Sequence, residues 1–146
     1  MNACGRSWFS FQTYIRILRR TGVPGVTSSR ASQSGRIDPG PRLTEATIYD
    51  DRIYLSGMIP ENTSQDITGQ TKQVLAEIDS LLEKGGSHHT KILSALIFLS
   101  DMNDFAAMNA VWDAWIVANA SPTRATVQAK LSAPAMKVEI MVVAAI

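Results

Sequence analysis

The sequence has a single cysteine, Cys4, among its 146 residues. One thiol cannot form an internal disulfide, and such scarcity is typical of a reducing compartment. No apolar run approaches the roughly 20 residues that a transmembrane helix requires. The only two histidines are adjacent, His88 and His89, whereas a zinc site needs three or four well-spaced ligands. We therefore predict a cytoplasmic protein with no metal site and no membrane segment.

Charge is distributed unevenly along the chain. Residues 1–37 contain six arginines and no acid, whereas residues 38–146 contain eight Lys and Arg against all thirteen Asp and Glu, a net charge of 8 − 13 = −5. Binding to a phosphate backbone needs clustered positive charge. The acidic body therefore makes a nucleic acid an unexpected partner, and only the basic N-terminus favours one.

The first 35 residues differ from the rest in composition, being rich in arginine and serine and free of acids. One short amphipathic helix could form over 8–18, and 28–35 is typical of a loop. Three interpretations remain open: an upstream stretch included by a misassigned start codon, an organellar transit peptide, or a functional basic arm. We predict that residues 1–35 are disordered or not native, and that 36–146 form the folded domain.

The apolar pattern beyond residue 36 predicts an α+β domain of order β-β-α-β-α-β-β. Ser64 or Asp66 can cap the first helix, and the pair Gly85-Gly86 can end it. The expected strands are 47–49, 52–55, 92–99, 124–129 and 137–144, and the expected helices are 66–84 and 104–118. We expect a sheet with both helices on one face. Its strands are too apolar to leave the other face in water, which predicts an oligomer that packs sheets together.

Two charged residues lie where the local pattern favours none, and they are the first candidates for chemistry. Glu139 is the only charge in its strand, and burying it unpaired would cost several kcal/mol. Arg124 opens the preceding strand, and its planar guanidinium suits two-point binding of a carboxylate. Ser56 could add a hydroxyl at another strand end. Two alternatives stay open: Glu139 on a solvent-facing edge, and Arg124 in a weak surface ion pair.

Four stretches resemble the RidA/YjgF family in their order and spacing. They are Leu55–Pro60, Asp101–Asn109, Pro122–Arg124 and Lys137–Ile140. The segments 36–38 and 112–115 resemble its YoaB-like branch. The resemblance covers residues 36–146 and leaves the first 35 uncovered.

The resemblance implies a chorismate-mutase-like fold, with a mixed sheet, and a homotrimer with clefts between subunits. It implies hydrolytic deamination of 2-imino acids and their enamine tautomers to 2-keto acids and ammonia, without a metal or organic cofactor. The implied partner is a small carboxylate substrate. By resemblance, Arg124 binds the substrate carboxylate and Glu139 orients the attacking water. The implied remaining cleft residues are Ser56, Gly57, Asn109 and Thr126.

The sequence also departs from the family pattern. Leu43 or a neighbour stands where active members often have tyrosine, Met58 where glutamine is common, and Thr126 where cysteine is frequent. These changes put the substrate preference and the deaminase activity itself in question. Two rival hypotheses therefore remain: a non-catalytic ligand-binding or regulatory trimer, and an RNA-directed endoribonuclease or translation inhibitor.

Overall fold

The computed structural model of the chain describes residues 34–146. The expected N-terminal extension therefore lies outside the described residues, apart from its last two. The strands are β1 (Ser34–Pro39), β2 (Thr44–Tyr49), β3 (Arg52–Leu55), β4 (Ile92–Leu99), β5 (Thr123–Gln128) and β6 (Val138–Ala145). The helices are α2 (Ile67–Lys84) and α3 (Phe105–Trp115), with single 3-10 turns at η1 (His89–Lys91) and η2 (Met102–Asp104).

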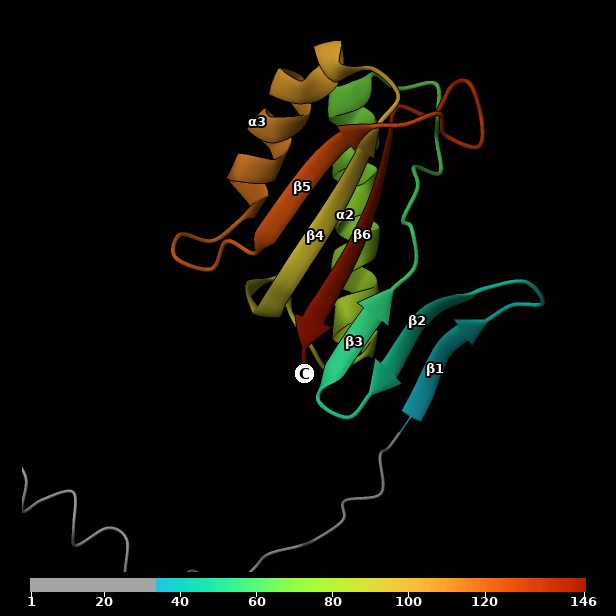
Figure 1. Cartoon of the computed structure of the whole chain (residues 1–146), viewed down its shortest axis with the longest axis vertical. Helices are drawn as coiled ribbons and strands as arrows, with labels where there is room; N and C mark the ends of the chain where they lie inside the picture. Colours follow the sequence, from blue (N-terminus) through green and yellow to red (C-terminus); the bar gives the residue numbers. More distant parts are fainter. Residues whose placement is uncertain (1–33) are drawn as a thin grey trace, which may run out of the picture. The chain divides into compact units, whose positions relative to one another are not determined.

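The strands form one sheet in the order β1-β2-β3-β6-β4-β5. β4 and β5 are parallel, because α3 connects them as a crossover, and every other pair is antiparallel. Both helices contribute to a single core against one face of this sheet (Figure 1). The expected mixed sheet with two helices on one face is confirmed. None of the helices in residues 34–146 combines the length and apolar character that a membrane crossing requires.

Strand β1 was not expected, and it extends the predicted order to β-β-β-α-β-α-β-β. Its sequence, Ser-Gly-Arg-Ile-Asp-Pro, has too little apolar alternation to indicate a strand. It forms by pairing along β2, with Gly35 opposite Ile48 and Ile37 opposite Ala46. Within the described residues, β1 already starts at Ser34, two residues before the predicted start and inside the expected loop.

Helix α3 ends at Trp115, three residues earlier than predicted. Ile116 already has extended backbone, and Asn119 has a positive φ of 65°. The apolar residues Ile116 and Val117 continued the helical pattern in the sequence, but they lead out of the helix toward β5. The start of α3 was predicted to within one residue, because Asp101 caps the preceding turn through the Asn103 N–H.

Helix α2 follows the expected pattern at both ends. The Asp66 carboxylate accepts a hydrogen bond from the Gly69 N–H at 2.9 Å and caps the start. At the end, Gly86 has φ 75°, and its N–H donates to the Glu83 carbonyl while that of Ser87 donates to Leu82. These two bonds form a Schellman motif, in which glycine tolerates the left-handed conformation. The predicted apolar face of α2 is buried throughout.

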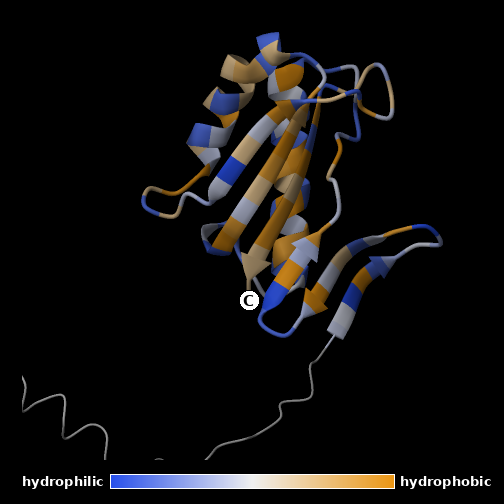
Figure 2. Cartoon of the chain, viewed as in Figure 1, coloured by the Kyte–Doolittle hydropathy of each residue, from blue (hydrophilic) through white to orange (hydrophobic). Residues whose placement is uncertain are grey.

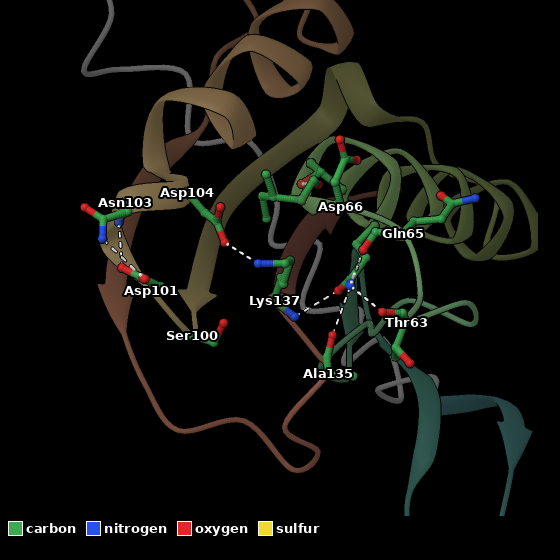
Figure 3. Close-up of polar contacts among 12 residues, drawn as sticks. Thr63, Gln65, Asp66, Ser100, Asp101, Asn103, Asp104, Ala135 and Lys137 are labelled. Atoms are coloured by element: carbon green, nitrogen blue, oxygen red, sulfur yellow. Dashed lines mark hydrogen bonds and ion pairs between the residues drawn. The ribbon is translucent and has the colours of Figure 1, made fainter.

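A polar residue missed by the apolar pattern, Gln70, is fully buried on α2. Its side-chain N–H groups donate to the carbonyls of Thr63, Gln65 and Ala135, and its carbonyl accepts from the Lys137 N–H at 2.8 Å. The Lys137 ammonium also pairs with Asp104 at 3.0 Å (Figure 3). This buried amide therefore anchors the loop that leads into β6.

The opposite face of the sheet carries no helix. In β6, Val138, Ile140 and Val142 are buried while the alternate residues are half-buried or exposed. The exposed apolar side chains on this open face include Tyr54, Leu96, Val127 and Met141, which are 39–46% exposed. Figure 2 shows that β4 and β6, at the centre of the sheet, are largely hydrophobic. The open sheet face is thus an apolar surface rather than a solvated one.

Candidate active site

Glu139 lies on β6 and projects from the open sheet face. Its neighbours Val138 and Ile140 are both 0% exposed in the core, so strand alternation directs Glu139 to the other side. It is half-buried, and it forms no ion pair in the part of the chain that the structure describes. Strand alternation also places Met141 and Val143 on this face.

A β-bulge beside Glu139 shapes the backbone around it. Tyr54 pairs with Val143, and Met58 pairs with Ile140. The segment 54–58 therefore advances by four residues while β6 advances by three. The extra residue falls in the stretch containing Ser56 and Gly57. Bulges re-aim side chains and are common next to functional sites. The Ser56 N–H donates to Glu45 at 2.9 Å, which keeps this stretch attached to β2.

Gly57 is in direct contact with the Glu139 carboxylate. A Cβ atom at residue 57 would overlap Glu139 Oε1 and lie 2.8 Å from Cδ. Only glycine therefore allows Glu139 to occupy its position without a shift. The structure brings together three of the residues expected in the site: Ser56, Gly57 and Glu139.

Arg124 lies on β5 and projects from the helix-covered face. It is level with Ala95 of β4, which is 2% exposed in the core. Its guanidinium carbon lies 5.2 Å from the centroid of the Trp112 ring on α3, a cation–π contact. The side chain is exposed, and Arg124 forms no ion pair within residues 34–146. The alternative of an intramolecular surface ion pair finds no partner among these residues.

Two unsatisfied polar atoms lie close to Arg124 along the junction of α3 and β5. Thr126 is two residues further on the same face of β5, and Asn109 is one helical turn before Trp112. Thr126 Oγ1 and Asn109 Oδ1 are both buried and have no hydrogen-bond partner. Buried polar atoms normally have one, so each calls for a water molecule or a ligand group.

The six residues expected in one site thus form two separate groups within a chain. The Arg half contains Arg124, Thr126 and Asn109, and the Glu half contains Ser56, Gly57 and Glu139. β4 lies between their strands, with Glu139 level with Phe98. From standard strand spacings, the Cα atoms of Arg124 and Glu139 lie roughly 10 Å apart across the sheet and roughly 10 Å apart along it. Their side chains also leave opposite faces.

Three surface cavities in residues 34–146 lie away from both charged residues. Two cavities of about 660 and 760 Å³ share Met136 in their linings, and neither contains Arg124 or Glu139. A third, of about 310 Å³, lies between α2 and α3. Sequence reasoning identified both charged residues from their apolar surroundings, but the side of the sheet that Arg124 faces depends on the pairing of β5 with β4. It also missed the contact between Arg124 and Trp112, which depends on how α3 packs beside β5.

Comparison with known proteins finds similarity over the whole described domain. A family model described as endoribonuclease L-PSP matches residues 34–146. The RutC family protein YoaB of Escherichia coli K12 is 51% identical over 111 residues, which cover 76% of this chain and 96% of that protein. The mitochondrial protein mmf1 of Schizosaccharomyces pombe is 32% identical, covering 92% of this chain and 87% of that one.

Solved structures show the same architecture. A YjgF family member from Neisseria meningitidis has a TM-score of 0.76 and 43% identity, covering 77% of this chain and 94% of that one. A putative translation initiation inhibitor from Salmonella typhimurium has a TM-score of 0.72 and 49% identity, covering 78% and 98%. The similarity therefore includes the sequence and the fold together.

Proposed function

The chain belongs to the RidA/YjgF family, whose family model is described as endoribonuclease L-PSP, and from this premise we propose that it hydrolyses reactive 2-imino acids and their enamine tautomers to 2-keto acids and ammonia. The observation that carries the proposal is a pair of charges that form no ion pair within residues 34–146: Arg124, placed on the Trp112 ring, and Glu139, which lies against Gly57. A cation and a carboxylate kept free of partners can each serve a ligand.

Arg124 binds the substrate carboxylate in this proposal. A guanidinium donates two parallel hydrogen bonds to a carboxylate, which fixes both the position and the orientation of the ligand. The contact with Trp112 leaves the guanidinium edge available for these bonds. The buried atoms Asn109 Oδ1 and Thr126 Oγ1 lie close by and can hold a polar group of the substrate or a bound water.

Glu139 acts as the base that activates water. The protonated imine carbon is electrophilic, and the water oxygen bonds to it while one water proton passes to the Glu139 carboxylate. That proton then goes to the nitrogen of the resulting carbinolamine. The C–N bond breaks as the carbonyl forms, ammonia leaves, and the hydroxyl proton is released to the ammonia. Positioning accounts for much of such an acceleration.

Two copies of the chain are needed to bring the halves together. Arg124 and Glu139 leave opposite faces of one sheet, so a second chain has to place its own half opposite the first. The open sheet face, with Leu96, Val127 and Met141 exposed, supplies an apolar surface for that assembly. A homotrimer closes such a contact by cyclic symmetry and gives three equivalent clefts.

A non-catalytic trimer that binds 2-keto acids is the second candidate. Thr126 favours it, because a hydroxyl stands where the family often has a thiol. The third candidate, an RNA-directed activity, is named in the family description, but residues 38–146 carry a net charge of −5. Phosphate binding is weak on such a surface.

A cytoplasmic location is part of the proposal, with an organellar location as the alternative. The relative from Schizosaccharomyces pombe is described as mitochondrial, whereas the YoaB relative from Escherichia coli is bacterial. Expression of residues 1–35 fused to a fluorescent protein distinguishes the two. Diffuse cytosolic fluorescence supports the first, and organellar import supports the second.

Ammonia release from freshly generated 2-iminopropanoate or 2-iminobutanoate tests the proposed function. We expect the full chain to accelerate release and Arg124→Ala to lose about a thousandfold in kcat/KM, because the anchoring charge is absent. Arg42→Ala is the matched control, since Arg42 is exposed in the turn after β1. No acceleration, with 2-oxobutanoate still bound, supports the binding trimer. Cleavage of RNA that requires Arg124 supports the third candidate.

A further inference from the structure

We infer that Trp112 is a positioning residue for Arg124, and that a brace made of Asp79, Trp115 and His89 fixes Trp112 in turn. The inference rests on the proposed function, because it assigns a role within the carboxylate-binding half of the same site. It adds residues from α2, α3 and the η1 turn to a site that so far contained only Asn109 outside the strands and the bulge.

The contact between Arg124 and Trp112 is the first step. The Trp112 side chain is 4% exposed and packs in the core, so its ring has a fixed position. The Arg124 side chain is exposed and has several rotatable bonds, and the structure places its guanidinium against this fixed ring. A long side chain held in place loses less entropy when it binds a ligand.

Trp115 is the second step. Its ring lies 5.4 Å from that of Trp112 at an interplanar angle of 59°, within the range of favourable aromatic pairs. Its indole N–H donates to Asp79 Oδ2 at 2.8 Å. Asp79 lies on α2, so this hydrogen bond ties the last residue of α3 to the neighbouring helix. Trp112 lies one turn before that tie.

His89 completes the brace from the turn before β4. Its Nδ1 lies 2.8 Å from Asp79 Oδ1, and its ring centroid lies 4.9 Å from that of Trp115. Both oxygens of Asp79 are therefore engaged. The brace thus holds Asp79, Trp115 and His89 together beside the Trp112 ring.

Packing alone does not require this arrangement. A core position needs apolar volume, whereas Trp115 directs a donor at one oxygen of Asp79 and His89 directs a ring nitrogen at the other. Three elements, α2, α3 and η1, meet at one carboxylate. The same chain of contacts leads through Trp112 to the guanidinium that the substrate is proposed to meet. The brace therefore acts on the strength of carboxylate binding, not on the bond-making step.

Steady-state kinetics with 2-iminopropanoate tests the role of Trp112. For Trp112→Leu, we expect KM to rise about threefold to thirtyfold, the range of a lost cation–π contact, with kcat changed less than about twofold. Trp112→Phe keeps a ring face and should recover most of the affinity. Trp115→Phe removes only the N–H that reaches Asp79, and we expect a rise of about twofold to fivefold.

Phe105→Leu is the matched control, because Phe105 is a half-buried aromatic two turns earlier on α3, whereas the cation–π contact of Arg124 is with Trp112. It should lower thermal stability while leaving KM unchanged. The inference is wrong if Phe105→Leu raises KM as much as Trp112→Leu, or if Trp112→Leu leaves KM at the wild-type value.

NMR of the full chain separates this inference from the proposed function. The ring current of Trp112 should displace the Arg124 side-chain resonances upfield, with Arg124→Lys identifying the signals. The displacement should disappear in Trp112→Leu and persist in Trp112→Phe. This result upholds the positioning role even if no imine hydrolysis is found. Arg124 signals that are the same in the wild type and in Trp112→Leu overturn it, whatever the kinetics show. If Trp112→Leu does not fold, Trp115→Phe is the deciding variant. Arg124 signals and a KM that both match the wild type in Trp115→Phe would contradict the proposed role of the brace.

Discussion

The two halves of the candidate site are held by different means. In the Arg half, a long exposed side chain rests on Trp112, whose ring is fixed by contacts from other elements. In the Glu half, a shorter side chain fits against Gly57 beside a bulge in a central part of the sheet. One half therefore depends on side-chain packing, and the other depends on backbone geometry.

The difference is the reason that we expect a single chain not to contain the complete candidate site. The Arg half lies on the helix-covered face of the edge strand β5, and the Glu half lies on the open face of the inner strand β6. A site built within one chain would place both charges on one face. This separation leads to our central claim, that the two halves meet across a contact between two copies.

The largest expected effect comes from charging the open sheet face. Leu96 is 46% exposed on that face, and we expect Leu96→Asp to dissociate the proposed trimer, because burying an unpaired carboxylate costs several kcal/mol. When the chains dissociate, turnover should be lost as well. Light scattering and ammonia release measure the two effects. Val117→Asp is the control, since Val117 is 45% exposed but lies after α3, outside the sheet. A Leu96→Asp trimer with normal turnover contradicts the assignment of this face.

The next effect tests the Glu half alone. Gly57→Ala adds a methyl group where the Glu139 carboxylate lies, so the carboxylate has to move. We expect kcat to fall about tenfold to a hundredfold, a partial loss of the roughly hundredfold to ten-thousandfold that a positioned general base contributes. Gly35→Ala is the matched control, because its added methyl would meet only the Ile48 Cβ, at an ordinary 3.8 Å. Normal kcat in Gly57→Ala would show that the position of Glu139 is not critical.

Much of this fold was predictable because local pattern and tertiary structure agree. The apolar run at 92–99 became β4, and the helical spacing between Asp66 and Gly85 became α2. β1 was missed because its stability comes from pairing with β2 and not from its own sequence. The end of α3 was misplaced because Ile116 and Val117 continue the apolar spacing in an extended segment.

The residues of the candidate site were easier to predict than their arrangement. Glu139 and Arg124 were identifiable because a charge in an apolar strand needs a reason. The face on which Arg124 lies follows from its register with Ala95, and the bulge before Met58 follows from pairing with β6. Neither pairing is encoded in a local period. Gln70 was missed for a related reason, since its burial serves distant carbonyl groups rather than an apolar face.

A smaller effect concerns the support of the strand that carries the Glu half. Gln70→Leu removes four hydrogen bonds and leaves the Lys137 N–H unpartnered two residues before Glu139. We expect the free energy of unfolding to fall by about 3 kcal/mol, the scale of a buried donor left unsatisfied. Urea denaturation measures it. Gln73→Leu is the control, because the hydrogen bonds of the Gln73 side-chain amide are exposed. An equal loss of unfolding free energy in both variants would refute the special role of Gln70.

The smallest effect lies far from both halves. The Lys84 ammonium meets Asp38 at 2.9 Å, and this hydrogen bond and charge raise the pKa of Lys84. Because the pKa of Lys84 is raised in the folded state, the pair contributes fully to the free energy of unfolding below the ordinary lysine pKa. This contribution is lost as the pH rises through the raised pKa. Both side chains are exposed, so salt screens the pair. We expect Lys84→Met to leave the thermal midpoint at neutral pH and kcat/KM unchanged within error.

Mixed trimers test the central claim most directly. Arg124→Ala and Glu139→Gln should each be inactive alone. When the two variants are co-expressed in equal amounts, they should recover about a quarter of wild-type turnover. The reason is that random assembly leaves this fraction of clefts with an intact Arg half from one chain and an intact Glu half from its neighbour. A mixture that contains verified mixed trimers and yet remains inactive would place both groups within one chain and contradict the claim.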